Sequence, residues 1–241
     1  MSRLRPLVLC YHAVSDHWPH ALAVGPAALE AQLRRLLARG FRPVGAAETL
    51  RAGRNGLHVT FDDAFRSVEH ALPVLERLGV RATVFACSGL AEAGLPLDVP
   101  ELADDVARYP DELVTMSWDE LRALAERGVE VGSHTVSHPH LPRLSDEELA
   151  RELGESRDRL EDELGRPCRF LAYPFGDEDE RVRTAARAAG YDGAFALPGR
   201  ADSDDAHAIP RVGIWREDTR LRAALKTSAP ARRAQLLLSR R

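Results

Sequence analysis

The chain has 241 residues, a length that suits one α/β domain with a full hydrophobic core. Hydrophobic residues make up 44% and charged residues 29%, as in ordinary globular proteins, and no apolar stretch approaches the ~20 residues of a membrane span. The net charge of −4 argues against nucleic acid as a partner, because nucleic-acid binders carry a basic face.

Strand-like and helix-like segments alternate along the chain. Apolar and β-branched runs predict strands at residues 7–11, 57–61, 80–87, 129–132, 170–173, 191–197 and 212–215. Helical spacing and stop signals predict helices at residues 26–39, 65–78, 117–127, 145–164 and 178–189. Ser117 with Glu120, and Ser145 with Glu148, form capping boxes. This alternation predicts parallel strands covered by helices.

Three connecting or terminal segments are polar. Residues 89–116 form a long acidic connection, which we expect either to wall a substrate groove or to be a solvated insertion. Residues 199–207 are expected to be a solvated loop. The arginine-rich tail from residue 216 favours a solvated amphipathic helix over one that docks on an anionic membrane or a partner.

Two strand ends carry residues that suit a metal site. Asp62 and Asp63 follow one predicted strand, and His134 and His138 follow another. Two imidazoles and a carboxylate leave a position for water on a metal, and the second carboxylate remains for proton transfer. The alternatives are a helix cap for the aspartates and ordinary packing for the histidines. His140, two residues after His138, could instead form a different pair of histidine ligands.

These segments resemble the polysaccharide deacetylases, carbohydrate esterase family four with the NodB-homology domain. Four motifs occur in the family's order from about residue 7 to about residue 215: Leu9-Cys10-Tyr11-His12, Thr60-Phe61-Asp62-Asp63, His134-Thr135-Val136-Ser137-His138 and Phe170-Leu171-Ala172-Tyr173-Pro174-Phe175-Gly176. The first resembles the opening strand of the branch that deacetylates biofilm polysaccharides. The resemblance implies a distorted (β/α) barrel, commonly seven-stranded, with its site at the C-terminal ends of the strands.

The resemblance also implies a role for each motif residue. Asp63, His134 and His138 are the expected ligands of one divalent metal, with zinc first and cobalt, nickel or iron as alternatives. Asp62 is the expected general base, and the backbone N–H of Phe175 is expected to stabilise the oxyanion. His140 lies outside the family pattern.

The chain departs from the family pattern at three points. Ala64 replaces a glycine after the two aspartates, and Ala172 replaces the arginine that orients the base in many members. Arg211 is a candidate for that role, whereas Arg169 is expected on another side of the strand. The late histidine that many members use as general acid is missing. We expect His12 near the site, with substrate binding, proton donation and simple strand-end hydrogen bonding all open.

The predicted function is a metal-dependent N-deacetylase that hydrolyses the acetamide of an N-acetylated sugar or polysaccharide. Residues 1–215 are expected to form the catalytic domain and residues 216–241 a basic helical tail. Two alternatives are a small-molecule or cyclic amide hydrolase on the same scaffold, and a non-catalytic sugar-binding or assembly protein that retains the metal. The polar start favours a cytoplasmic location, with export as the alternative, because the first apolar run is too short for a signal peptide.

Overall fold

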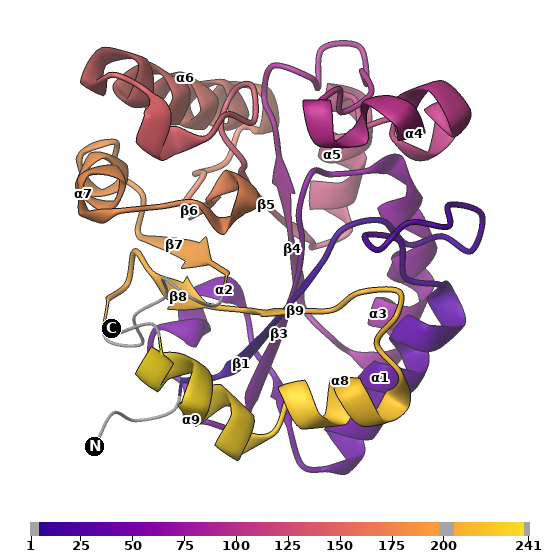
Figure 1. Ribbon diagram of the computed structural model, residues 1–241. Coiled ribbons are helices and arrows are strands. Elements are labelled where there is room, and N and C mark those ends of the chain that lie inside the picture. The colour runs from indigo at the N-terminus through magenta and orange to yellow at the C-terminus, as the bar shows by residue number, and fades with distance from the viewer. Residues whose placement is uncertain (1–4, 198–204, 239–241) are drawn as a thin grey trace.

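The computed structural model describes residues 5–197 and 205–238. Within them all paired strands are parallel (Figure 1). The strands are β1 (Leu7–Tyr11), β2 (Arg42–Pro43), β3 (Gly56–Phe61), β4 (Ala82–Ala86), β5 (Glu130–Ser133), β6 (Phe170–Ala172), β7 (Gly193–Ala196), β8 (Ile209–Pro210) and β9 (Val212–Gly213). The α-helices are α1 (Pro26–Ala38), α2 (Ala46–Thr49), α3 (Leu72–Leu78), α4 (Ala103–Arg108), α5 (Trp118–Glu126), α6 (Asp146–Leu164), α7 (Glu180–Ala188), α8 (Arg220–Lys226) and α9 (Ala229–Leu238).

The sheet curls until its two ends meet. Its strand order is β8-β7-β6-β5-β4-β3-β1-β9, with β2 paired to β3 at the side. The end strands β8 and β9 are consecutive in the chain and are separated only by Arg211. One stretch of chain therefore bonds β7 on one side and β1 on the other, which closes the barrel. The expected distorted barrel is confirmed, and its wall counts eight short strands because the last stretch is split at Arg211.

Successive side chains along each strand point to opposite faces of the sheet, so the apolar residues form two layers. One set of side chains faces the helices and forms the main core, with members such as Leu9, Val59 and Leu171. Neighbouring residues fill the barrel, where Phe85, Phe170 and Phe195 pack together.

Most helices follow their sequence signals. Both predicted capping boxes form, since Ser117 and Ser145 each exchange hydrogen bonds with the glutamate three residues on. The expected helix at 65–78 differs, because its first half is a 3-10 helix, η1 (Arg66–Ala71), that precedes α3. Pro73, near the start of α3, lacks the N–H that a continuous α-helix would use. The short α2 and β2 were not predicted.

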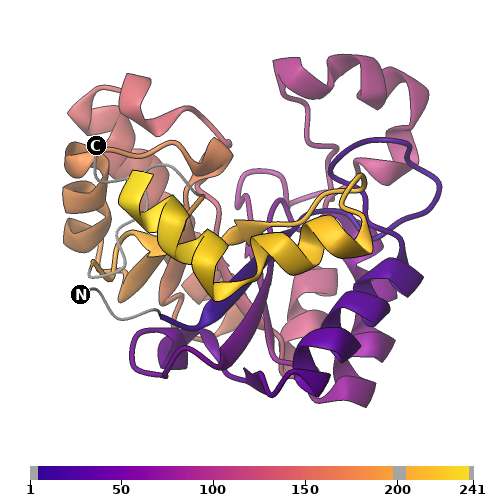
Figure 2. The ribbon, with the colours of Figure 1, turned by 60° about the horizontal axis from the view of Figure 1, so that its bottom comes forward.

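The acidic connection at 89–116 is packed onto the barrel and is not a solvated insertion. It contains η2 (Pro100–Leu102), α4 and η3 (Pro110–Glu112). Leu97, Val99 and Leu102 form a separate apolar cluster with Trp18 and Phe65. The segment stands beside the end of the barrel where the strands terminate (Figures 1 and 2). The alternative in which it walls a groove is the one that the structure favours.

The described part of the tail forms two helices, α8 and α9, and lies across the outside of the barrel (Figure 2). Thr227 is buried, and Arg232 donates hydrogen bonds to the carbonyls of Arg5 and Pro6 at the start of β1. The described tail therefore forms two helices instead of the single one that we expected, with some side chains packed on the barrel and others, such as Leu221 and Leu225, exposed. Arg240, Arg241 and most of the predicted loop at 199–207 lie outside the described residues. No helix in the described ranges is long and apolar enough to cross a membrane.

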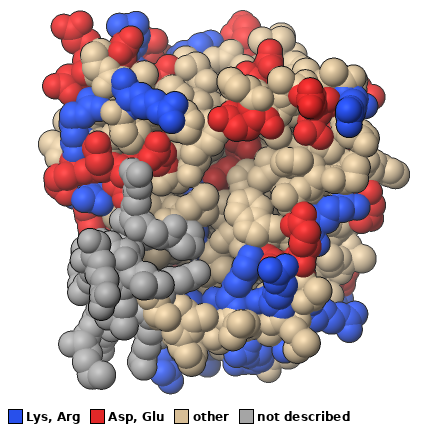
Figure 3. All heavy atoms as spheres, viewed as in Figure 1, with Lys and Arg blue, Asp and Glu red and all other residues tan. Residues whose placement is uncertain are grey.

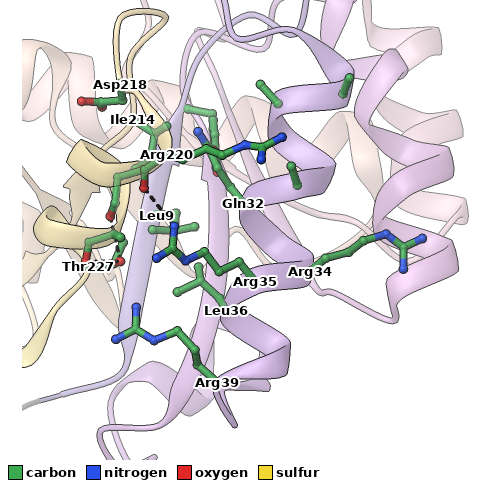
Figure 4. A pocket seen from close by; sticks show the side chains of 16 residues that line it. Leu9, Gln32, Arg34, Arg35, Leu36, Arg39, Ile214, Asp218, Arg220 and Thr227 are labelled. Carbon is green, nitrogen blue, oxygen red and sulfur yellow. Dashed lines mark hydrogen bonds between the residues drawn. The ribbon is translucent and has the colours of Figure 1, made fainter.

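A cavity of about 620 Å³ separates α8 from α1 (Figure 4). Leu9 and Ile214 line it from the barrel, and Leu36 lines it from α1. Across it, Arg35 donates a hydrogen bond to the carbonyl of Arg220 at 3.1 Å, so α8 is held to α1 partly by polar contact. None of the predicted site residues lines this cavity.

Candidate active site

Each motif places its polar residues just beyond the C-terminal end of a strand, as parallel barrels do. His12 follows β1, the aspartates follow β3, His134 follows β5 and Pro174 follows β6. His12, Asp62, Asp63, His134 and His138 line one cavity of about 290 Å³, together with Phe175. The structure thus brings together every site residue that the sequence predicted.

Several of these residues adopt a left-handed backbone conformation, which orients their side chains toward the cavity. Within the described ranges, five residues other than glycine have positive φ, and all lie in the motifs: Asp63 (67°), Ala64 (48°), Thr135 (71°), His138 (61°) and Phe175 (58°). Such conformations cost free energy in L-residues and tend to cluster at functional sites. The turn after β3 lets both aspartates reach one site, although neighbours on a regular strand point to opposite faces.

The neighbouring elements hold these turns in place. The Glu152 carboxylate on α6 accepts hydrogen bonds from the backbone N–H groups of Val136 and Ser137, at 2.8 and 3.0 Å. The alternative role of the aspartates as a helix cap is not seen, because η1 has no side-chain capping bond.

Asp63, His134 and His138 form a buried group that could hold a metal ion. Asp63 Oδ1 lies 3.4 Å from His134 Nε2 and 3.3 Å from His138 Nε2. Asp63 Oδ1 has no hydrogen-bond partner within the described residues, which is costly for a buried carboxylate oxygen. His134 Nδ1 bonds the carbonyl of Ala172 at 2.7 Å, and donation there would leave Nε2 with its lone pair toward Asp63. A converging oxygen and two nitrogens fit a divalent metal such as zinc.

Asp62 lies beside this group and is paired with Arg211. Arg211 Nη1 donates to Asp62 Oδ1 at 2.6 Å and Nη2 donates to Oδ2 at 2.8 Å. Burial alone would raise the pKa of the Asp62 carboxyl, but the Arg211 guanidinium together with His134 and His12 lowers that pKa below its usual value. Thr60 accepts a further bond from Arg211, and the Cys10 thiol donates to Asp62 Oδ2 at 3.4 Å. Arg211, named from the sequence as a candidate partner of Asp62, is therefore paired with it in the structure.

His12 lines the cavity from the end of β1. Its ring stacks on Trp215 with centroids 5.5 Å apart, and its Nδ1 has no hydrogen-bond partner in the described part of the chain. Burial lowers the pKa of His12, while the nearby Asp62 and Asp63 carboxylates work in the opposite direction.

Phe175 occupies the tight turn η5 (Pro174–Gly176) at the cavity mouth. The hydrogen bonds of the turn use the N–H groups of Gly176 and Asp177 rather than that of Phe175. The half-exposed Phe175 ring stacks on His140 with centroids 4.1 Å apart. His140 is bonded to Asp177 and does not join the Asp63 group.

One other candidate from the sequence lies elsewhere. Arg169, the other arginine named beside Arg211, forms a surface pair with Asp192. Sequence reasoning missed Trp215, Cys10 and Glu101 as neighbours of the site. Trp215 follows the last strand and Cys10 stands two residues before His12 in the first motif, so both had local signals, whereas no local pattern marks Glu101.

Comparison with known proteins identifies the family. The sequence model described as "Polysaccharide deacetylase" matches residues 50–194. The chain therefore belongs to the polysaccharide deacetylase family, as its motifs predicted.

Individual relatives cover most of the chain. The Bacillus subtilis protein YxkH is 23% identical over 217 residues, which span 86% of this chain and 70% of YxkH. The structure of BC0361, a polysaccharide deacetylase from Bacillus cereus, is 25% identical with a TM-score of 0.75, over 94% of this chain and 70% of that one. The Streptococcus pyogenes deacetylase PplD, solved with acetate, shares the fold at 21% identity and a TM-score of 0.76, over 94% and 100% of the two chains.

Proposed function

We propose that this protein is a metal-dependent hydrolase that removes acetyl groups from the amines of an N-acetylated sugar or polysaccharide. The observation that carries the proposal is the convergence of two different acidic groups in one cavity. Asp63 meets two imidazoles in a metal-type cluster, while Asp62 is held separately by Arg211. A protein that only bound sugar would not need the second carboxylate.

Asp63, His134 and His138 would hold the metal. A divalent ion bound there would supply a Lewis acid, which polarises the acetamide carbonyl and acidifies water. At His134 the bond from Nδ1 to the Ala172 carbonyl sets the tautomer and leaves the lone pair of Nε2 for the metal.

Asp62 is the proposed general base. Its lowered pKa keeps it ionised, and the fork of Arg211 fixes the plane of its carboxylate. It would take the proton from the water that attacks the carbonyl carbon. Positioned proton transfer of this kind is typically worth 10²–10⁴ in rate.

Two further residues that line the cavity are proposed to stabilise the oxyanion and to protonate the leaving amine. The N–H of Phe175 is proposed to donate to the oxyanion, because the η5 turn does not consume it. His12 is proposed to pass a proton to the leaving amine as the carbon–nitrogen bond breaks. Stacking on Trp215 would hold its ring in place.

The test is acetate release from oligomers of N-acetylglucosamine and from small acetamides, measured with the protein stripped by chelator and then supplied with zinc, cobalt or nickel. We expect acetate from the oligomers only with metal. Turnover of the small acetamides alone would favour the small-amide alternative. Sugar binding without any turnover by the metal-loaded protein would favour the non-catalytic one.

A further inference from the structure

The segment 89–116, which supplies Leu97, Val99, Glu101 and Leu102 to the cavity lining and is called the acidic wall below, carries far more negative charge than the rest of the protein. Residues 89–116 contain seven acidic residues and one basic residue, a net of −6, whereas the whole chain has a net of −4. Outside this wall the protein is therefore slightly positive. Figure 3 shows acidic side chains gathered on the α4 side of the central hollow.

Most of this charge is not neutralised by ion pairs. Within the described ranges, Glu92 pairs with Arg159 at 3.4 Å, and Glu101 approaches only His140 Nε2, at 3.9 Å. Asp98 and Asp104 are exposed and form no ion pair with a described residue, and Asp105 accepts a hydrogen bond from the Trp18 indole N–H. Glu101 itself lines the catalytic cavity between the apolar residues Val99 and Leu102.

The cavity is built to take a ligand beside this wall. His12 is about nine-tenths buried and lines the cavity, and its Nδ1 lacks a hydrogen-bond partner among the described residues. No lysine or arginine in the described part of the chain lines the cavity to oppose Glu101. Unpaired surface charges act over a Debye length, about 8 Å at physiological ionic strength.

We propose that the acidic wall selects glycan chains by charge, favouring amine-bearing, cationic chains over neutral ones and excluding chains that carry carboxylates. This rests on the proposed function and names its substrate class. Each hydrolysis adds water across the acetamide carbon–nitrogen bond, releases acetate and leaves an amine that takes up a proton. The product unit is therefore cationic. The wall would attract a chain that has already been partly deacetylated, so new deacetylation would occur next to earlier sites.

Equilibrium binding tests the charge preference without any turnover. The zinc-loaded protein is titrated at pH 6 with glucosamine hexamer, with N-acetylglucosamine hexamer and with an N-acetylated hexamer that carries carboxylates. At about 20 mM salt we expect the cationic hexamer to bind about tenfold more tightly than the neutral one, and the anionic one more weakly than both. At 0.5 M salt the three affinities should converge, because salt screens the wall.

A charge-matched pair of variants assigns the effect to the wall. The variant Asp98→Asn/Glu101→Gln/Asp104→Asn removes three charges from the wall. The control Glu147→Gln/Glu155→Gln/Asp158→Asn removes three from exposed positions of α6, which does not line the cavity. We expect the cationic-to-neutral affinity ratio to fall several-fold in the first variant and to change by less than twofold in the second.

Equal affinities in the wild-type protein, or equal losses in the two variants, would overturn the proposal. Acetate release from the neutral hexamer is measured alongside. If acetate is released without any charge preference, the proposed function stands and this inference fails. If the charge preference is present without acetate release, the inference about charge stands and the proposed function fails.

Discussion

Arg211 and Asp62 form a two-pronged ion pair inside the barrel, with nitrogen–oxygen distances of 2.6 and 2.8 Å. Both side chains are almost fully buried. Arg211 sits at the seam where β8 gives way to β9, and Asp62 follows β3. One contact therefore joins the closure of the barrel to the proposed catalytic base.

Loss of Arg211 should make the protein less stable. Arg211→Met leaves a buried carboxylate without its partner, which typically costs about 3–5 kcal/mol. Denaturant unfolding should show this loss of stability. The double variant Arg211→Met/Asp62→Asn should recover part of it, because the unpaired buried carboxylate is no longer present. Arg169→Met is the control, since its exposed pair with Asp192 should contribute less than about 1 kcal/mol. Equal losses for Arg211→Met and the control would contradict the role given to Arg211.

The two adjacent aspartates should respond differently to the same substitution. Asp62→Asn should keep the metal-binding group and lose on the order of 10²–10⁴ in turnover, because the base is removed. Asp63→Asn should weaken metal binding, and excess metal should restore part of the activity. Metal content by elemental analysis, measured beside acetate release, separates the two effects. Metal loss in Asp62→Asn but not in Asp63→Asn would mean that the roles are reversed.

At the η5 turn, the backbone should matter more than the aromatic ring. Phe175→Ala keeps the N–H that is proposed for the oxyanion and should retain substantial activity. Gly176→Ala should reduce kcat more, because Gly176 has a φ of 65° and an added Cβ would lie 2.6 Å from the Cβ of Leu197. If Phe175→Ala proves the more damaging change in kcat measurements, the ring itself contacts the substrate.

His58 should make the protein less stable as the pH falls. It lies inside the barrel, bonded to the Val44 carbonyl and the Thr83 hydroxyl, and burial lowers its pKa to about 4. Between pH 6.5 and 4 the unfolded chain binds a proton at this position that the native state does not. Stability is therefore present above pH 6.5 and is lost as the pH falls toward 4, by roughly 3 kcal/mol.

Urea unfolding at pH 7 and pH 4.5 measures this loss. The variant His58→Gln should lose less stability than the wild type between the two pH values. The exposed His17→Gln should behave like the wild type. If all three proteins show the same pH dependence, His58 does not carry the effect.

The sequence by itself determined the order of strands and helices, the capping boxes and the motif residues. These depend on local periodicity and on short spacings, which are readable along the chain. Residues 65–78 show the limit of this reading, because helical spacing does not distinguish a 3-10 turn from an α-helix. The placement of His12, Asp62 and His134 past strand ends followed from the parallel arrangement that the alternation predicts.

Only the tertiary structure decided which distant residues meet. Arg211 reaches Asp62 across 149 positions because the barrel closes at Arg211, and no local pattern encodes that closure. The stacking of Trp215 on His12 likewise depends on the pairing of the last strand with β1. The acidic wall was visible as composition, but its position beside the site depends on the packing of Leu97, Val99 and Leu102 against residues from other loops. Burial and closure are properties of the whole chain, so they appear only once it is folded.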